Sequence, residues 1–385
     1  MIPSSVTVTS KLPNVGTTIF TVMSAMAVEH NAINLSQGYP DFPISEQLID
    51  LVRHYMSNGH NQYAPMPGVP ALRQQIANKL QISLDQKFDS DREITITAGA
   101  TEGLYSALTA FVQKGNEVII FDPAYDLYAP AVQLSGGTPV HIELKLPYFT
   151  IDWEQLEAAI TNRTKVIVIN NPNNPAGSIL TEEDLQRLSD LVVQHELILI
   201  SDEVYEHMVY HQQGHQSILK FPELRARGVA VFSFGKTFHA TGWKVGYCVA
   251  PEFLTKELRK VHQFVAFSVN TPVQMALADF LKAPEHYQSL SAFFQEKRDL
   301  FLGLMKTSRF VPLPCNGTYF QLMDYHAISD RPDTEMASWM TKEHGVASIP
   351  TSVFYNKRTD QKILRFCFAK NPETLTRATE KLCKI

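Results

Sequence analysis

The chain carries the stretch Ser233-Phe234-Gly235-Lys236-Thr237 directly after an apolar run at residues 228–232, and Lys244 follows within the next ten residues. A short apolar run of this kind is typical of a buried strand. A lysine held in a folded pocket at the end of such a strand can form a Schiff base with a carbonyl compound. Alternatively, Lys236 and Lys244 are both surface charges, since a lysine is rarely buried without a partner. The other motifs of the chain bear on this choice.

Short apolar runs followed by polar clusters recur through the first two thirds of the chain. They cover residues 94–96, 118–121, 166–169, 197–200 and 229–232, and helix-like segments separate them. Continuous apolar runs that alternate with helices are typical of a mostly parallel sheet buried on both faces. In such sheets ligands bind beyond the carboxyl ends of the strands, where all these clusters fall. We therefore predict an α/β fold with its functional site at that edge.

The C-terminal third has a different pattern. Residues 289–305 and 333–344 have helical periodicity, and residues 318–323 and 363–368 have the pattern of strands. This predicts a smaller α+β domain that the N-terminal segment joins. We expect a large domain at 45–280, and a small domain with an N-terminal arm formed by 1–44 and 281–385.

Composition argues against several classes of protein. The net charge of −5, the pI near 6.2 and the absence of any Lys/Arg run argue against a nucleic-acid binder. The four cysteines form no CxxC pair and the thirteen histidines no HExxH motif, so neither a structural zinc site nor a catalytic metal is indicated. No apolar run approaches the ~18 residues that span a bilayer, and the N-terminus has no secretion signal. We expect a cytoplasmic protein without a membrane or metal partner.

Gly99-Ala100-Thr101 lies between a predicted strand and an apolar-periodic helix. Backbone N–H groups at a helix N-terminus bind anions, and small residues there let a phosphate approach. Ser233 and Lys244 can complete such a phosphate site with a hydroxyl and a charge. Alternatively, Thr101 simply caps the helix and Glu102 complements its dipole. The stretch is not a GxGxxG fingerprint, which argues against an NAD-dependent dehydrogenase.

Asp202 follows the run at 197–200 and has two interpretations. It caps a helix that begins at Glu203, or it is a buried carboxylate paired with a protonated pyridine nitrogen. Tyr205 and Asn174 can hydrogen-bond to a phenolic oxygen on the same ring. Tyr125 can stack on the ring face, or it is an ordinary core aromatic.

Arg365 lies in an alternating segment, Ile363-Leu364-Arg365-Phe366-Cys367-Phe368. Period-two alternation sends Leu364, Phe366 and Phe368 to one face and Arg365 to the other. The face that carries Arg365 is either solvated, or it presents the guanidinium to a substrate carboxylate as a bidentate fork. Arginine suits such bidentate binding better than lysine.

Taken together, these motifs resemble the fold-type I aminotransferases of class I and II, enzymes that depend on pyridoxal phosphate. The resemblance covers essentially the whole chain. Besides the lysine stretch and Arg365-Phe366, it rests on ordered motifs at residues 34–42, 61–63, 173–177 and 201–205. It implies a large domain with a mostly parallel sheet, a smaller α+β domain, and a pyridoxal 5'-phosphate cofactor.

The resemblance also implies a role for each candidate residue. Lys236 is the Schiff-base lysine and Asp202 the partner of the pyridine nitrogen, while Asn174 and Tyr205 contact the ring oxygen and Tyr125 stacks on the ring. Arg365 binds the substrate α-carboxylate, and Gly38 lies in the substrate loop. The implied phosphate ligands are Gly99, Ala100, Thr101, Ser233, Lys244 and, from the neighbouring subunit, Tyr63. A homodimer with shared active sites follows from that last role.

Lys244 stands where aspartate aminotransferases have arginine, which points to the kynurenine, glutamine and methionine aminotransferase subgroup. Within it the chain resembles bacterial methionine aminotransferases at residues 11–13, 16–20 and 267–272. Phe20 and Asn270 occupy positions where kynurenine aminotransferases usually have tryptophan and histidine, and we expect both to contact substrate. The resemblance implies transfer of an amino group from methionine, and other neutral or aromatic amino acids, to a 2-oxo acid by a ping-pong mechanism.

Three alternatives stay open at this stage. One is a kynurenine or glutamine aminotransferase, and another is a cysteine-conjugate β-lyase that uses the same lysine for elimination. The third is a regulatory or scaffold protein of the same fold. Such regulators resemble an aminotransferase fused to a DNA-binding head, and no such head fits before Asn34. The intact Lys236, Asp202 and Arg365 also argue against a silent scaffold.

Overall fold

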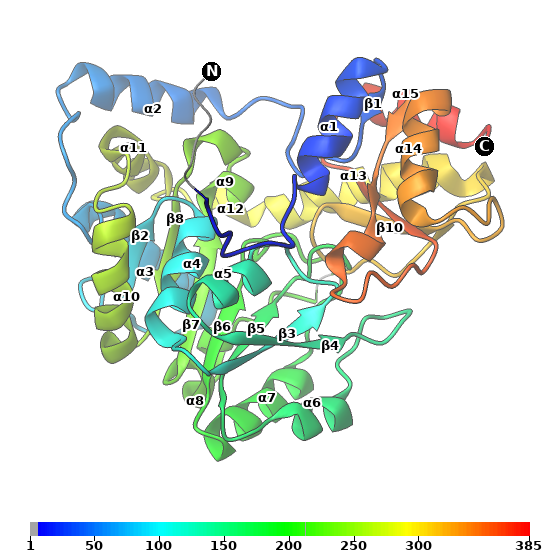
Figure 1. Cartoon of the computed structure of the whole chain (residues 1–385). Coiled ribbons are helices and arrows are strands. Elements are labelled where there is room, and N and C mark those ends of the chain that lie inside the picture. Colours follow the sequence, from blue (N-terminus) through cyan, green and yellow to red (C-terminus); the bar gives the residue numbers. More distant parts are fainter. Residues whose placement is uncertain (1–6, 212) are drawn as a thin grey trace.

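A seven-stranded sheet forms the centre of the protein, in the order β2-β8-β7-β6-β5-β3-β4 (Figure 1). The computed structural model describes residues 7–211 and 213–385. The strands of this sheet are β2 (Ile94–Thr97), β3 (Glu117–Asp122), β4 (Thr138–Glu143), β5 (Thr164–Asn170), β6 (Ile198–Asp202), β7 (Gly228–Ser233) and β8 (Gly246–Val249). All the apolar runs predicted as strands are confirmed. Their β-branched residues are buried on both faces, as in a parallel sheet covered by helices.

One strand of this sheet runs against the others. β8 pairs antiparallel with both β2 and β7, while β3–β4, β3–β5, β5–β6 and β6–β7 are parallel pairs. The carboxyl ends of β2, β3, β5, β6 and β7 therefore lie at one edge. The register aligns polar strand-end residues with one another at that edge: Asn170 is opposite the candidate Asp202, and Thr97 and the candidate Ser233 are both opposite Gly246.

Helices flank the central sheet, and α4 packs across its middle strands (Figure 1). They are α2 (Glu46–Ser57), α3 (Pro70–Leu84), α4 (Ala100–Phe111), α5 (Tyr128–Leu134), α6 (Trp153–Ala159), α7 (Glu182–Gln194), α8 (Pro222–Arg225), α9 (Phe234–Thr237), α10 (Glu252–Val265) and α11 (Thr271–Phe280). Local sequence fixes several helix ends. Thr181 and Asp184, for example, form a reciprocal capping box that starts α7.

A small four-stranded antiparallel sheet, in the order β12-β13-β10-β9, belongs to the C-terminal third. Its strands are β9 (Val311–Pro312), β10 (Phe320–Asp324), β12 (Ile349–Pro350) and β13 (Ile363–Cys367). The helices of this third are α12 (Glu285–Gln288), α13 (Leu290–Leu304), α14 (Asp333–His344) and α15 (Pro372–Leu382). The predicted α+β character of this part is confirmed, and together with the central sheet it confirms the predicted fold class.

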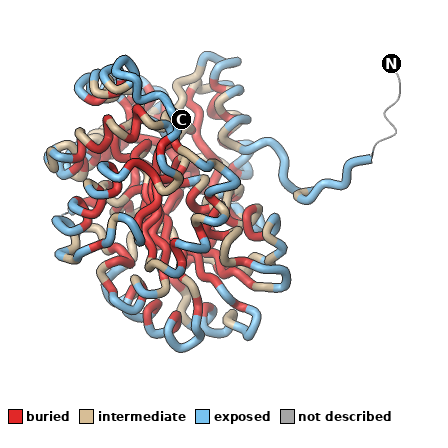
Figure 2. Tube along the Cα trace, turned by 90° about the vertical axis from the view of Figure 1, so that its left-hand side faces the viewer, coloured by how far each residue is buried: buried red, intermediate tan, exposed pale blue. Residues whose placement is uncertain are grey.

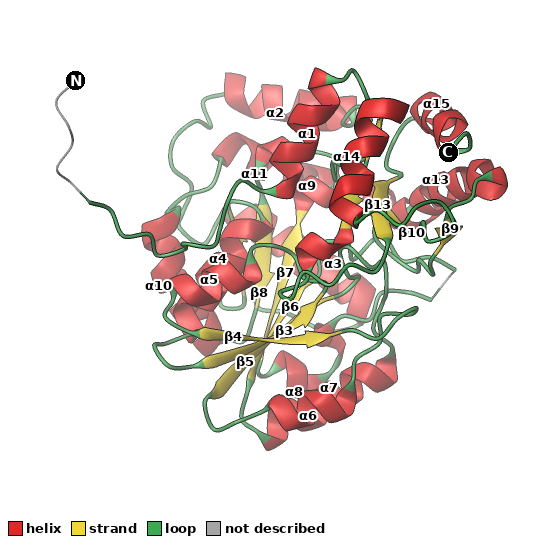
Figure 3. Ribbon diagram, turned by 45° about the vertical axis from the view of Figure 1, so that its right-hand side comes forward, coloured by secondary structure: helices red, strands yellow, loops and turns green. Residues whose placement is uncertain are grey.

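The N-terminal segment packs on this C-terminal part. Helix α1 (Ile19–Glu29) lies against α14 (Figure 3). The short strand β1 (Ile33–Asn34) pairs in parallel with β11 (Val346–Ala347). The domain limits at 45 and 280 stay predictions, and residues 1–6 of the predicted arm lie outside the described part of the chain.

Burial separates the core from the start of the chain. Figure 2 shows the strands of the central sheet as mostly buried, apart from the partly exposed edge strand β4, while the stretch before α1 extends from the body and is exposed from residue 7 to residue 11 and from residue 13 to residue 18. Within the described ranges, no helix is long and apolar enough to cross a membrane.

Candidate active site

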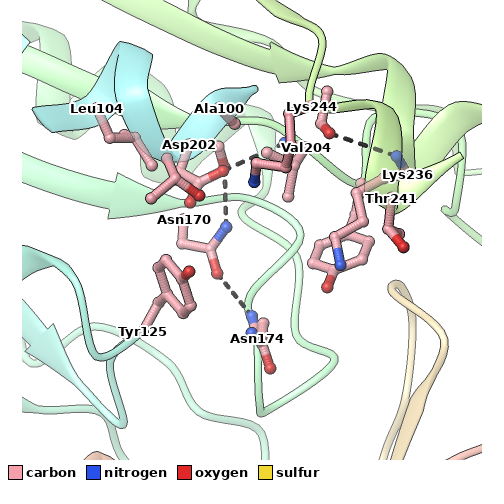
Figure 4. Close-up of a pocket in the computed structure, with 13 residues that line it drawn as sticks. Ala100, Leu104, Tyr125, Asn170, Asn174, Asp202, Val204, Lys236, Thr241 and Lys244 are labelled. Atoms are coloured by element: carbon pink, nitrogen blue, oxygen red, sulfur yellow. Dashed lines mark hydrogen bonds between the residues drawn. The ribbon is translucent and has the colours of Figure 1, made fainter. Parts of the chain in front are cut away.

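A cavity of about 170 Å³ opens at the carboxyl edge of the central sheet (Figure 4). Its walls come from the end of β5, from β6 and the turn after it, from the start of α4, and from the segment after β7. Its lining residues are Ala100, Thr101, Leu104, Tyr125, Asn170, Asn174, Asp202, Val204, Tyr205, Ser233, Lys236, Thr241 and Lys244. Most of the predicted cofactor residues therefore meet in one space, although they are widely separated in the sequence.

The start of α4 and Lys244 form one wall of the cavity. Gly99 precedes the helix with φ +78°, and a Cβ there would lie 3.2 Å from the Lys244 amine. Gly246 is equally constrained, because its Cβ would come within 2.8 Å of the Ala100 nitrogen. Ser233 Oγ accepts a hydrogen bond from the Lys236 backbone N–H (3.3 Å), so its own hydroxyl proton is free for another acceptor. Helix N–H groups, a hydroxyl and an ammonium on one wall are suited to an anion.

The interpretation of Thr101 as a helix cap is wrong. The cap residue of α4 is Gly99, and it makes no side-chain capping bond. Glu102 is held locally, since its carboxylate accepts from the Ala98 N–H (3.0 Å) and the Ser106 hydroxyl (2.5 Å). Thr101 instead faces the cavity.

Asp202 is a buried carboxylate with a defined environment. Its Oδ2 accepts from the Tyr128 hydroxyl (2.6 Å) and its Oδ1 from the Val204 N–H (3.3 Å), but no helix begins at Glu203. Burial raises the pKa of Asp202 to about 6, against the opposite effect of the Tyr128 hydrogen bond. A cation in the cavity would therefore be strongly favoured beside it.

Asn170 joins Asp202 to Asn174, as Figure 4 shows. Its amide donates to the Asp202 carbonyl (2.9 Å), and its Oδ1 accepts from the Asn174 N–H (2.6 Å). The segment after β5 is thereby fixed against β6, and the Asn174 side chain is directed to the cavity and Arg365.

Lys236 lies in the short helix α9 and is only partly exposed. Its Nζ donates to the Gly38 carbonyl (3.1 Å) and to the Tyr319 hydroxyl (2.9 Å). Burial lowers the pKa of Lys236 to about 8, and the positive charges of Arg365 and Lys244 act in the same direction. Lys236 is therefore not a freely solvated surface charge, and a large fraction of its amines is neutral near pH 8.

Arg365 is 1 % exposed, so a solvated strand face is wrong for this residue; both faces of β13 are buried. One guanidinium nitrogen donates to Asn174 Oδ1 (2.7 Å) and the other to the Ser36 carbonyl (2.9 Å), while Nε is buried and has no partner in the described part of the chain. The guanidinium stacks on the Phe320 ring at 3.8 Å and lies 5.2 Å from the Phe20 ring. Burial lowers its pKa to about 10, which keeps it charged at neutral pH.

Tyr63 and Asn270 do not line the cavity. Tyr63 is 83 % exposed and packs edge-on against Phe267 at 5.5 Å. Asn270 is exposed and caps α11, accepting from the Val273 N–H at 3.2 Å. The two lie in neighbouring loops, since Thr271 donates to the Gln62 carbonyl at 2.6 Å. The structure brings these residues to one surface, outside their own chain's cavity.

Besides Thr241, sequence reasoning missed three polar residues of the site: Tyr128, Asn170 and Tyr319. Tyr128 is three residues beyond Tyr125, and Asn170 stands in the same asparagine-rich cluster as Asn174, so proximity in the sequence offered a signal for both. Tyr319 offered none, because it looked like one of two aromatic residues in a predicted strand. Leu104, Val204 and Thr241 complete the lining. Among the residues that the structure describes, no group of three or more His, Cys, Asp or Glu side chains is arranged to hold a metal ion.

The buried carboxylate of Asp202 and the amine of Lys236 thus lie at the carboxyl edge of the mostly parallel sheet, and the buried guanidinium of Arg365 approaches them from the small sheet through its bond to Asn174. The chain belongs to the family of class I and II aminotransferases, whose sequence model matches residues 30–382. The predicted family and enzyme class are thereby confirmed.

Individual relatives are similar over almost their whole length. The methionine aminotransferase of Escherichia coli (strain K12) is 52% identical over 374 residues, covering 97% of each chain. Kynurenine–oxoglutarate transaminase 1 of Homo sapiens is 34% identical over 395 residues, covering 93% of each. The solved structure of YbdL from Escherichia coli, for which a methionine aminotransferase function was identified, has a TM-score of 0.97 at 51% identity and covers 99% of this chain and 100% of that one.

Proposed function

We propose that this chain uses pyridoxal phosphate to move the amino group of methionine, and of other neutral or aromatic amino acids, to a 2-oxo acid. One observation carries the proposal: Lys236 and Asp202 line the same cavity, and Arg365 adjoins it through its hydrogen bond to Asn174. A proton-transferring amine, a carboxylate for a ring nitrogen and a carboxylate-binding fork are what this chemistry requires.

The residues present fit pyridoxal phosphate. The narrow gap between Gly99 and the Lys244 amine, which a Cβ would fill, suits the phosphate together with Ala100, Thr101 and Ser233. Asp202 would face the pyridine nitrogen, because its buried carboxylate gains from a cationic neighbour. Tyr205 and Asn174 would contact the ring oxygen, and Tyr125 the ring face.

When bound, pyridoxal phosphate supplies an electron sink for the bonding pair released at the substrate Cα. The lowered pKa of Lys236 lets its amine accept the Cα proton near neutral pH, as a general base, and donate a proton in the later step, as a general acid. Arg365 holds the substrate α-carboxylate and so orients the Cα–H bond toward that amine. Its buried Nε, which has no hydrogen-bond partner among the residues that the structure describes, is a donor that a bound carboxylate can satisfy.

Substrate choice follows from the surroundings of Arg365. The rings of Phe20, Phe320 and Phe354 surround its guanidinium at 5.2, 3.8 and 5.4 Å. An apolar substrate side chain gains from such rings, and the thioether of methionine makes favourable contacts with aromatic edges. The identity to the E. coli methionine aminotransferase supports the same choice. Because a methylene in an apolar pocket changes selectivity by only ~1–3 kcal/mol, we expect several neutral amino acids to react.

The exposed surface around Tyr63 supports a homodimer with shared sites. Tyr63, Phe264 and Phe267 are 83 %, 85 % and 46 % exposed, and the stretch before α1 is also exposed (Figure 2). A second copy would cover these apolar side chains and would bring Tyr63 to the phosphate and Asn270 to the substrate in its partner's cavity.

The four cysteines are all free thiols, which supports a cytoplasmic protein.

The test is a panel of amino acids offered with one 2-oxo acid to the protein loaded with pyridoxal phosphate. We expect methionine to give the highest rate of new amino acid, and Lys236→Ala to abolish it. Lys256→Ala, which removes an exposed lysine paired with Glu252, serves as the control and should react normally. Failure of every amino acid to transfer its amino group would contradict the proposal. Release of pyruvate and ammonia from cysteine S-conjugates as the main reaction would instead identify a β-lyase.

A further inference from the structure

Tyr319 lies in the bend directly before β10 and is fully buried. Its hydroxyl lies 2.9 Å from Lys236 Nζ and also contacts the carbonyl oxygen of Gly38. That carbonyl lies 3.1 Å from the same amine. The hydroxyl, the carbonyl and the amine thus form a closed triangle of polar contacts.

The donors and acceptors in this triangle can be assigned. The Gly38 carbonyl only accepts, so the single hydroxyl proton of Tyr319 is donated to it. The phenolic oxygen is then an acceptor for one N–H of Lys236, and the Gly38 carbonyl accepts a second. A neutral amine has two N–H groups and one lone pair. With both N–H groups engaged on this side, its lone pair is directed away from the triangle.

The triangle is held rigidly by packing. The Tyr319 ring packs edge-on against Tyr205 at 5.2 Å and lies 5.8 Å from Phe294. Gly38 is pressed onto the ring of Phe320, since a Cβ at Gly38 would come within 2.7 Å of that ring. Two consecutive residues, Tyr319 and Phe320, therefore fix the hydroxyl and the carbonyl relative to each other.

We propose that Tyr319 is a positioning residue for Lys236: its hydroxyl accepts one amine hydrogen and so aims the amine lone pair at the substrate Cα. The inference rests on the proposed function, because a lysine needs an aimed lone pair only if it takes a proton. Without the hydroxyl, the amine is held by the Gly38 carbonyl alone and can rotate about that one bond.

Other groups that face Lys236 stay unchanged when only the hydroxyl is removed. They are Arg365 and Cys367 on β13, Asp202 at the end of β6, Tyr205 in the turn after it, and Lys244 before β8. A change in the titration of Lys236 in Tyr319→Phe therefore reports the loss of the hydroxyl contact. Phenylalanine keeps the ring packing, and the Gly38 carbonyl keeps its bond to Lys236.

The first measurement uses the protein without cofactor. Lys236 is acetylated with acetic anhydride across a pH series, and the modified peptide is quantified by mass spectrometry. In Tyr319→Phe we expect the midpoint to fall by about one pH unit, because the ammonium form loses an acceptor. Tyr325→Phe is the matched control: this buried tyrosine donates to the Arg331 carbonyl at 2.9 Å, away from the cavity, and its loss should leave the midpoint unchanged.

The second measurement uses the protein loaded with pyridoxal phosphate. In Tyr319→Phe we expect kcat with methionine to fall about 10–100-fold and KM to change less than about threefold, since proton transfer and not binding is affected. Incorporation of 3-fluorotyrosine at position 319 retains the hydroxyl and should restore kcat to within about threefold of the unmodified protein. Thermal unfolding confirms that each variant is folded.

An unchanged midpoint for Tyr319→Phe overturns the inference, whether kcat falls or not, because a purely structural role does not move the titration of Lys236. An equal fall of kcat in Tyr325→Phe also overturns it. If the unmodified protein transfers no amino group, the proposed function fails. The midpoint shift, read without cofactor, still reports the Tyr319 contact separately.

Discussion

The cavity at the sheet edge and the surface around Tyr63 differ in how completely one chain builds them. In the cavity, side chains from several elements already touch: Tyr128 meets Asp202, Asn170 meets Asn174, and Lys236 meets Gly38. At the surface, Tyr63 and Asn270 are exposed and do not line the cavity. The first region is finished by folding, whereas we expect the second to be finished by association with another copy.

This difference separates two kinds of test. A substitution in the cavity should inactivate the site of the chain that carries it, and another copy with the same substitution should not restore that site. A substitution on the surface around Tyr63 should instead inactivate only the site of the partner chain. Activity measured in a mixture of variant chains should reveal this.

The largest effect is expected for Asp202→Asn. Removal of one partner of a buried charge pair costs ~3–5 kcal/mol, so kcat should fall about 200- to 5,000-fold. Steady-state kinetics with saturating cofactor would measure it. Asp333→Asn is the control, because Asp333 is also buried and bonded to Ser352 but lies away from the cavity. Equal losses in both variants would show that the effect is one of stability and not of the site.

Arg365→Ala should chiefly raise the KM for methionine. Loss of a buried, hydrogen-bonded charge that pairs with a substrate carboxylate costs ~2–5 kcal/mol, so we expect a rise of about 100-fold. Arg365→Lys restores the charge but not the fork, and should recover about tenfold of that loss. A normal KM in the alanine variant would move the carboxylate site elsewhere.

Tyr63→Phe should lower the transaminase activity by about 30-fold, since one hydrogen bond to a charged group is worth ~1.5–3 kcal/mol. Its sharper use is in a mixture with Lys236→Ala chains. If sites are shared, random exchange of subunits gives mixed dimers with one intact site each, and about a quarter of the normal activity returns. Mixing after covalent cross-linking prevents the exchange and serves as the control. Absence of recovery from freely exchanging chains would show that Tyr63 acts only within its own chain, or not at all.

The smallest effect concerns stability. The folded pKa of Lys236 is about 8, below the ~10.4 of an unfolded chain, so folding is penalised while both states bind the proton. In the protein without cofactor, Lys236→Met should therefore raise the free energy of unfolding at pH 7 by about 1 kcal/mol. This is less than the full pKa shift implies, because the amine is partly exposed and hydrogen-bonded. The sign follows from the lowered pKa: as pH rises from 8 to about 10.4, the original protein recovers this stability. Urea unfolding at pH 7 and pH 10 measures it, and a pH-independent difference would contradict the lowered pKa.

The sequence predicted the cavity well because its residues follow apolar runs directly. Asp202, Asn174 and Lys236 each lie at or just beyond a strand end, so a parallel sheet alone brings them to one edge. The antiparallel β8 was not predicted, since four buried residues give no sign of direction. Tyr319 was missed because its role depends on contact with Lys236 and Gly38, which are 83 and 281 positions away in the chain.

Other features could not be read from local pattern. The alternation around Arg365 suggested one polar face, but the segment after β1 and the cluster around Asn174 cover it and make both faces interior. Thr101 was a plausible helix cap by residue type, and only the left-handed backbone of Gly99 shows where the helix begins. In each case tertiary packing overrode a local preference.

The reversed strand β8 has a consequence for how this protein tolerates change. Because Thr97 of β2 and Ser233 of β7 both align with Gly246, a single strand width separates the segment that starts α4 from the segment that carries Lys236. The length of the connection at residues 234–245 therefore fixes the distance between the anion-binding wall and the reactive amine. An insertion or deletion there would displace both ends together, so we expect length variation among functional versions of this chain to fall in other loops.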